Sequence, residues 1–331
     1  MRKALVPFSL ILLVLAATHS HVVAQAARPE LHVELSRVVG FIKGQRYSLN
    51  RIKTELPELA LQAGKAESEF NLAFGAGEKK ILDAMREMLG ASFPGYEKKL
   101  HEVLASKLAS QPITRQLALD FIAQVESRAR GELPSPVRET LLSYQFMGMP
   151  AEEFSRGYTG VFRTTGHPKA KGLDFQISYP ASWKAAEGDR PNVVQKFMSR
   201  NGRGLEIIVL IVKDLPLPPG YKMTERELIS MFVESELKRI AGSGFISGKP
   251  ITLDGHRGGM FVSDEAVQRL DVTLKIRTLQ FVTVRRGKLI MVQCMVSTPP
   301  GEEATLQERF NRLEPLFRLV GNSFILQEQY R

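Results

Sequence analysis

The fold of the second half of this chain is decided by the stretch Phe175-Gln176-Ile177-Ser178-Tyr179-Pro180-Ala181-Ser182-Trp183. Apolar and polar residues alternate up to the tyrosine, which is the period of a β-strand with one buried face. The proline ends the strand, because it has no amide hydrogen to offer a central ladder. The single tryptophan of the chain follows three residues later, and we expect it to anchor the core.

Further strands are predicted around this one. The full set covers residues 173–179, 193–199, 205–213, 246–253, 259–267, 273–284 and 289–296. The strand at 205–213 is apolar at both alternating sets of positions, which predicts cover on both faces of the sheet. Glycine-containing basic turns join 193–199 to 205–213 and 273–284 to 289–296. The segment at 157–172 reads as a connector that contributes an edge strand.

Two long helices accompany these strands. One is predicted from Thr224, where Glu227 completes a capping box, to Gly242. The other follows Pro299 and Pro300, and we expect Pro315 to kink it. The predicted fold of this half is therefore α+β, with an antiparallel sheet flanked by two long helices.

The first half of the chain reads as helical from about residue 30 to residue 149. Apolar residues recur at helical spacing within 81–89, 100–108 and 117–125, and the connections between them are short. Short connections favour antiparallel neighbours, so we expect an all-helical bundle. Residues 75–80 superficially resemble a phosphate-binding loop but lack its spacing, and we expect them to join two helices.

The N-terminus carries the pattern of a cleaved secretory signal. Arg2 and Lys3 precede an apolar run, and Ala24 and Ala26 offer the small residues that a signal peptidase reads. We therefore expect a signal peptide at 1–26, a helical domain at 27–150, a linker at 151–172 and the α/β domain at 173–331. The mature chain is expected to lack a transmembrane segment and to be periplasmic or extracellular.

The excess positive charge lies in the second half of the chain. The formal charge is +10, yet residues 27–155 hold 17 basic and 17 acidic residues, whereas residues 156–331 hold 26 and 18. This asymmetry supports a division into two domains and points to an anionic partner for the second. A basic surface that serves only solubility is the alternative. Export and the lack of interleaved aromatic residues argue against nucleic acid.

The strand that ends at Pro180, the tryptophan at 183 and the order β-β-β-α-β-β-β-β-α resemble the PsbP-like family, over residues 170–328. This family is named after an extrinsic subunit of photosystem II and includes many exported bacterial proteins. The resemblance implies the α+β fold above and a role in binding or assembly rather than catalysis. We do not carry over the photosynthetic role, because the residues that bind metal in the plant proteins have no match here. The helical half is foreign to that subunit.

The candidate binding residues are the cations of the two basic turns. They are Arg200 and Arg203 in the first turn and Arg285, Arg286 and Lys288 in the second. If both turns lie at one end of the sheet, they form a cationic rim able to meet phosphate or carboxylate groups. Charged hairpin tips that only guard the sheet against aggregation are the competing interpretation.

No catalytic residue, metal site or cofactor is predicted. His32, His101, His167 and His256 lack the spacing of metal ligands, and Cys294 alternates with apolar residues as a buried structural thiol does. We therefore expect a non-catalytic exported module that binds or assembles an anionic envelope component or another exported protein. The alternatives are a carrier of a small or amphiphilic ligand, held between the sheet and a helix or in the bundle, and a hydrolase of an envelope polymer that uses His256 or His167.

Overall fold

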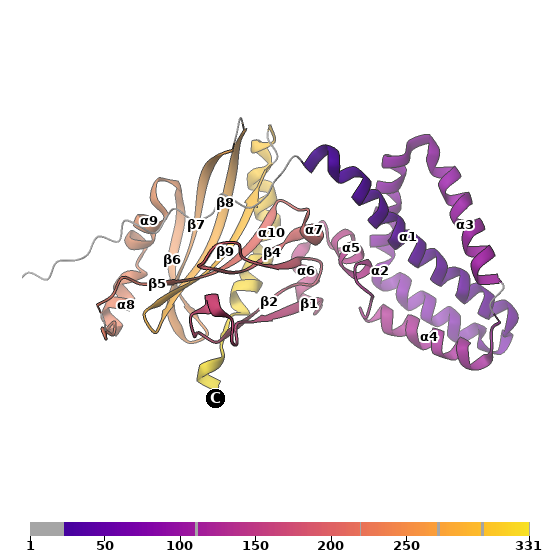
Figure 1. Cartoon of the computed structure of the whole chain (residues 1–331), viewed down its shortest axis with the longest axis horizontal. Coiled ribbons are helices and arrows are strands. Elements are labelled where there is room, and N and C mark those ends of the chain that lie inside the picture. The colour runs from indigo at the N-terminus through magenta and orange to yellow at the C-terminus, as the bar shows by residue number, and fades with distance from the viewer. Residues whose placement is uncertain (1–22, 110–111, 219, 270–271, 299–300, 331) are drawn as a thin grey trace, which may run out of the picture. The chain divides into compact units, whose positions relative to one another are not determined.

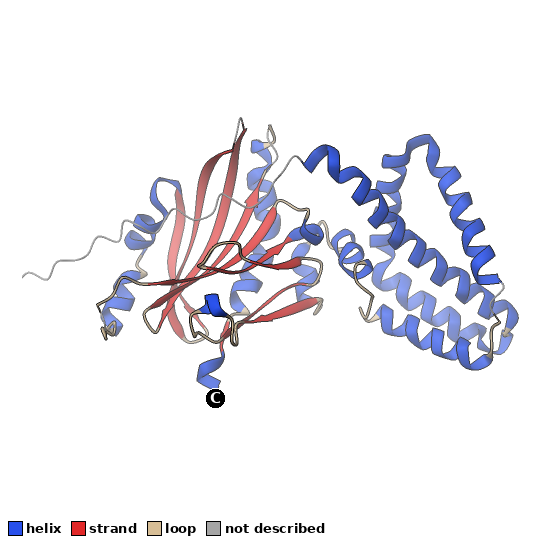
Figure 2. Cartoon of the chain, viewed as in Figure 1, coloured by secondary structure: helices blue, strands red, loops and turns tan. Residues whose placement is uncertain are grey.

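The computed structural model describes residues 23–109, 112–218, 220–269, 272–298 and 301–330. Residues 1–22, which hold most of the predicted signal peptide, lie outside this part of the chain. The described chain forms two compact units, and the division between them falls between Met147 and Gly148. The first unit is helical and the second combines helices with strands, as predicted (Figure 2).

The helical unit contains long α-helices joined by short connections. They are α1 (Val23–Glu55), α2 (Ala60–Leu89), α3 (Phe93–Ala109), α4 (Arg115–Ala129) and α5 (Val137–Gln145), with 3-10 turns at Pro57–Leu59 and Gly90–Ser92. The core takes one apolar stripe from each of four helices, because each is amphipathic. Its largest fully buried side chains include Leu35 and Leu49 of α1, Phe74 and Ile81 of α2, and Leu141 and Leu142 of α5. From α4 it takes Ile122 and Val125.

The helix α2 runs unbroken through residues 75–80, so the expected helix junction there is wrong. Gly77 does not form a turn. It allows α5 to pack closely against α2. A Cβ atom at this position would lie 3.1 Å from the Leu141 carbonyl oxygen of α5, and the Gly77 amide donates a 2.6 Å hydrogen bond to Gln145 Oε1. Glycine therefore lets α5 approach the backbone of α2.

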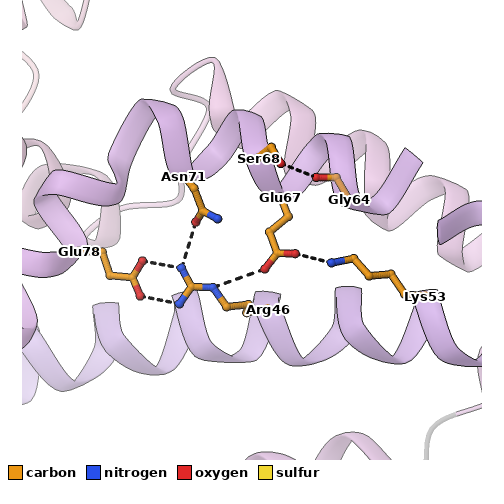
Figure 3. Close-up of polar contacts among 7 residues, drawn as sticks. All are labelled: Arg46, Lys53, Gly64, Glu67, Ser68, Asn71 and Glu78. Atoms are coloured by element: carbon orange, nitrogen blue, oxygen red, sulfur yellow. Dashed lines mark hydrogen bonds and ion pairs between the residues drawn. The ribbon is translucent and has the colours of Figure 1, made fainter. Parts of the chain in front are cut away.

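A polar network also joins α1 to α2 (Figure 3). Arg46 donates from Nη1 and Nη2 to the two carboxylate oxygens of Glu78, at 2.8 and 2.7 Å. Its Nη2 atom also donates to Asn71, and its Nε lies 3.6 Å from Glu67, which pairs with Lys53 as well. The bidentate geometry fixes the register of the two helices.

The second unit begins with α6 (Pro150–Ser155) and contains two antiparallel sheets. The smaller has the order β1-β2-β10, from Thr159–Arg163, Phe175–Pro180 and Ile325–Leu326. The larger has the order β3-β4-β5-β9-β8-β7-β6. Its strands are β3 (Lys184–Glu187), β4 (Val193–Met198), β5 (Glu206–Asp214), β6 (Phe245–Leu253), β7 (His256–Arg269), β8 (Val272–Arg285) and β9 (Lys288–Ser297). The segment expected to be a linker contains α6, the edge strand β1 and a 3-10 turn at Pro168–Ala170.

One face of the large sheet is covered by α10 (Leu306–Asn322), drawn in yellow in Figure 1. Phe310, Leu313 and Phe317 of this helix are buried against the sheet, and the helix continues through Pro315. Trp183 is 5% exposed and meets the Phe317 ring edge-on, with 6.5 Å between the centroids. The tryptophan is therefore a core anchor, as expected.

The opposite face is covered by α8 (Glu225–Met231) and α9 (Glu234–Ala241). The capping box of Thr224 and Glu227 and the stop at Gly242 are present, but the single helix expected between them breaks at Phe232 and Val233. Five residues turn a continuous helix by about 500°, which would place Phe232 and Leu237 on different sides. The break lets both reach Gly259 of β7, where a Cβ atom would lie 3.2 and 2.6 Å from them.

Candidate ligand-binding cleft

A cleft of about 380 Å³ lies between α10 and the edge of the large sheet. The volume falls in the range of small-molecule sites. Strands β6, β7 and β8 form its base and α10 forms its wall. The lining residues are Ile246, Ser247, Gly248 and Lys249 of β6, Met260, Phe261 and Val262 of β7, Arg277 of β8, and Gln307, Phe310, Asn311, Glu314 and Arg318 of α10.

The register of the sheet explains which β6 residues face the cleft. Ser247 pairs with Val262 and Lys249 pairs with Met260, and cross-strand partners share one face of a sheet. Met260 and Val262 belong to the core under α10, so Ser247 and Lys249 also face that helix. A bulge at Phe245/Ser247 distorts the start of this edge strand.

Arg277 forms the most ordered polar contact of the cleft. Its Nε and Nη2 atoms donate to Asp264 Oδ1 and Oδ2, both at 2.7 Å, and its Nη1 donates to Gln307 of α10. The guanidinium also stacks over the Phe310 ring at 5.6 Å. The hydrogen bonds to Asp264 raise the pKa of Arg277. This side chain thus holds β7, β8 and α10 together at one end of the cleft.

Arg318 reaches over the base of the cleft from α10. Its Nε and Nη2 donate to Glu314 Oε1, at 3.0 Å from Nε, and its Nη1 lies 3.3 Å from the Met260 sulfur. A guanidinium has five N–H donors, so three contacts leave two donors for other groups. The side chain is 44% exposed, which keeps those donors accessible.

Lys249 is the cation of the cleft that has no partner among the described residues. Within the described part of the chain, it takes part in no hydrogen bond or ion pair. Arg277 and Arg318 are neutralised by Asp264 and Glu314, whereas the Lys249 ammonium carries an uncompensated positive charge. The cleft therefore combines an apolar base of Met260, Val262 and Phe310 with one available cation.

The two basic turns of the sequence lie at opposite ends of β5. Met198, which precedes the first turn, pairs with Ile207 at the start of this strand, whereas Lys288 of the second turn pairs with Asp214 at its end. The structure therefore does not bring Arg200 and Arg203 together with Arg285, Arg286 and Lys288 into one rim. None of the five lines the cleft.

The cations of the second turn form ion pairs with the carboxylates of Asp214 and Glu328. Lys288 Nζ donates to Asp214 Oδ1 at 3.0 Å, and Lys171 also pairs with Asp214. Arg285 Nε and Arg286 Nη2 lie 3.6 and 3.0 Å from Glu328 Oε2, in ion pairs without hydrogen-bond geometry. In the first turn, Arg200 is exposed and takes a left-handed φ of 50°.

The described histidines contact amides and aromatic rings. His256 Nε2 lies 3.1 Å from Gln329 Oε1, and His167 Nδ1 accepts from the Lys169 amide at 3.2 Å. His32 and His101 lie edge-on to Tyr96 and Tyr47. Among the residues described, no three His, Cys, Asp or Glu side chains gather as metal ligands would. Cys294 is fully buried, as predicted, and burial raises the pKa of its thiol.

No sequence motif marks the residues of the cleft. The available signal was the polar stripe of Gln307, Asn311, Glu314 and Arg318, which recur at helical spacing on one side of the final helix. Lys249 could not be recognised, because its face depends on the pairing of β6 with β7.

Comparisons with known proteins give distant structural similarities. No protein-family model matches the chain, and no curated protein matches it. Cyanobacterial PsbP (CyanoP) from Synechocystis sp. PCC 6803 aligns at 18% identity with a TM-score of 0.32, covering 51% of this chain and 92% of that protein. LpqN, involved in cell envelope biogenesis of Mycobacterium tuberculosis, aligns at 14% identity with a TM-score of 0.29, covering 54% and 96%. A Pseudomonas aeruginosa protein, PA94, aligns at 13% identity and a TM-score of 0.23, covering 50% and 96%. None of the three assigns this chain to a family.

Across the described helices, none combines the length and the apolar character that a membrane span requires.

Proposed function

We propose that this protein is an exported, non-catalytic binding module of the cell envelope or secreted fraction, and that its α+β unit binds a small amphiphilic ligand in the cleft beside α10. The observation that carries the proposal is the cleft itself. It has an apolar base of Met260, Val262 and Phe310, two prepositioned guanidinium groups, and the ammonium group of Lys249, which is unpaired within the described part of the chain. Clefts in which polar groups converge beside apolar residues are typical of ligand sites.

The ion pairs of the cleft favour a role in ligand binding in addition to a role in stabilising the fold. Arg277 is held by Asp264 and Phe310, and Arg318 is held by Glu314, so neither side chain has to be ordered when a ligand enters. Preorganised polar groups reduce the entropic cost of binding. The carrier alternative from the sequence, with a ligand between the sheet and a helix, is therefore the form of binding that we favour.

The hydrolase alternative has no comparable support. Within the described chain, no histidine hydrogen-bonds to a carboxylate, and neither His167 nor His256 lines the cleft. A general base needs an orienting partner and a place for substrate beside it.

Export and domain order form the second part of the proposal. We propose a signal peptide at 1–26, a helical domain at 27–150 and a PsbP-like domain at 173–331. The support is the leader pattern around Arg2 and Ala24, together with the antiparallel sheet flanked by helices.

Native mass spectrometry of the full chain, purified from its host without detergent, tests the function. We expect a retained small molecule that is lost from a Ser247→Trp variant, because Ser247 is an exposed residue on the cleft face of β6. Thr252→Trp is the matched control, since Thr252 is an exposed residue of the same strand whose partner Arg257 belongs to the opposite face. No retained molecule in the unaltered protein, or equal loss from both variants, would contradict the proposed function.

A further inference from the structure

We infer that the cleft selects a singly charged organic anion, a carboxylate with a short apolar body, and that Lys249 is the residue that selects it. This inference rests on the proposed function and adds the chemical class of the ligand. Two observations carry it: Lys249 pairs with Met260 across β6 and β7, and both residues line the cleft.

The charge balance of the cleft indicates a monoanion. Two of its three cations have carboxylate partners, Asp264 for Arg277 and Glu314 for Arg318. Lys249 has none among the described residues, so the site carries one net positive charge. A ligand with one negative charge neutralises the site. A cationic ligand would add a second unpaired charge beside Lys249, which is unfavourable near an apolar surface.

The position of the polar groups indicates which part of the ligand lies where. Lys249 stands on the exposed edge strand, and Met260, Val262 and Phe310 are each less than 10% exposed. The carboxylate would therefore lie at the rim beside Lys249, and the apolar body would lie on the base.

The length of the apolar body is bounded by the cleft. A volume of about 380 Å³ accommodates a chain of several carbons together with its head group. Polar side chains of α10, such as Asn311, line the wall, and a second acyl chain laid against them would bury polar groups without partners. A single-chain or single-ring acid is the class that fits.

Isothermal titration calorimetry of the full chain with three probes of one length tests this inference. The probes are octanoate, octanamide and octylammonium, which differ in head-group charge. We expect octanoate to bind about 5- to 10-fold more tightly than octanamide, as for one charge-assisted hydrogen bond, and octylammonium to bind least. Lys249→Gln should remove the preference for octanoate over octanamide.

Two control variants accompany this measurement. Lys249→Arg should retain the preference, because the charge is kept, and Lys238→Gln should also retain it, because Lys238 is an exposed residue of α9 on the opposite face of the sheet. Equal binding of octanoate and octanamide, or an unchanged preference in Lys249→Gln, would overturn the inference while leaving a ligand-binding cleft. Absence of binding by all three probes would overturn the proposed function together with it.

Discussion

Arg277 and Asp264 are cross-strand partners of β8 and β7, and they form a bidentate pair with both N–O distances at 2.7 Å. The pair lies at one end of the cleft, where Phe310 stacks on the guanidinium. The side chain of Arg277 is 14% exposed and that of Asp264 is 40% exposed. Water can therefore rehydrate the aspartate when its partner is removed, which limits the energetic effect of breaking the pair.

Replacing Arg277 by methionine is expected to lower the free energy of unfolding by about 1–2 kcal/mol, from the lost ion pair and the lost cation–π contact. Urea denaturation of the full chain measures the change. Arg312→Met of α10 is the control, because Arg312 has no ion pair in the described structure, and it should change stability little. Equal effects of the two substitutions would show that the pair does not stabilise this end of the cleft.

Replacing two glycines of α2 by alanine should change the stability of the protein in opposite directions. Nothing lies within 4 Å of a Cβ atom on Gly75, so Gly75→Ala should raise the free energy of unfolding by about 0.5–1 kcal/mol through helix propensity. A Cβ atom on Gly77 would meet Gln145 Oε1 at 3.0 Å and the Leu141 carbonyl oxygen at 3.1 Å. Gly77→Ala should therefore lower stability in thermal unfolding followed by circular dichroism. An increase for both variants would rule out close packing of α5 on α2.

The Arg46–Glu78 pair should contribute measurable coupling between α1 and α2. The Glu78 side chain is 10% exposed and receives two hydrogen bonds, so a double-mutant cycle with Arg46→Met and Glu78→Gln should give about 1–2 kcal/mol. The Lys65–Glu69 pair of α2 is the control, with side chains 71% and 43% exposed and a distance of 3.8 Å. Its coupling should stay below about 0.5 kcal/mol. Similar values for both pairs would contradict the structural role of Arg46.

Asp214, the last residue of β5, should make the free energy of unfolding depend on pH. Hydrogen bonds from Lys171 and then Lys288 lower the pKa of Asp214 from its ordinary value of 3.8. A carboxyl group whose pKa is lowered on folding stabilises the folded state above its unfolded pKa and loses this effect as the pH falls through its folded pKa. Asp214→Asn should therefore lower stability at pH 7, and its difference from the unaltered protein should shrink below pH 3.8. A difference that is constant between pH 7 and pH 2 would contradict the ion pairs.

Local patterns predicted most elements of the α+β unit, and tertiary packing decided the rest. The strand ending at Pro180, the capping box at Thr224 and the burial of Trp183 and Cys294 follow from residue types at fixed spacings. The break at Phe232 was not predictable, because it depends on two side chains reaching Gly259 of another strand. The strand β3 was missed, since its four residues carry little alternation.

The cleft depends on long-range pairing in the same way. Lys249, Met260 and Arg318 are far apart in the sequence, and only the register of β6 with β7 and the packing of α10 bring them together. The two basic turns show that composition alone can mislead. Their similar residues suggested one binding site, whereas the strand pairings place the turns at opposite ends of β5. The amino-acid sequence shows which residues are charged, whereas the topology of the sheet determines which charged residues lie close together.

The central claim is that the ligand lies on the face of the sheet under α10. Methyl-labelled methionine NMR of the full chain, titrated with octanoate, tests it most directly, because Met260 lines the cleft whereas Met291 and Met295 pack on the opposite face. We predict a saturable shift of the Met260 methyl signal, with those of Met291 and Met295 unchanged. An unmoved Met260 signal, or shifts confined to Met291 and Met295, would contradict the account.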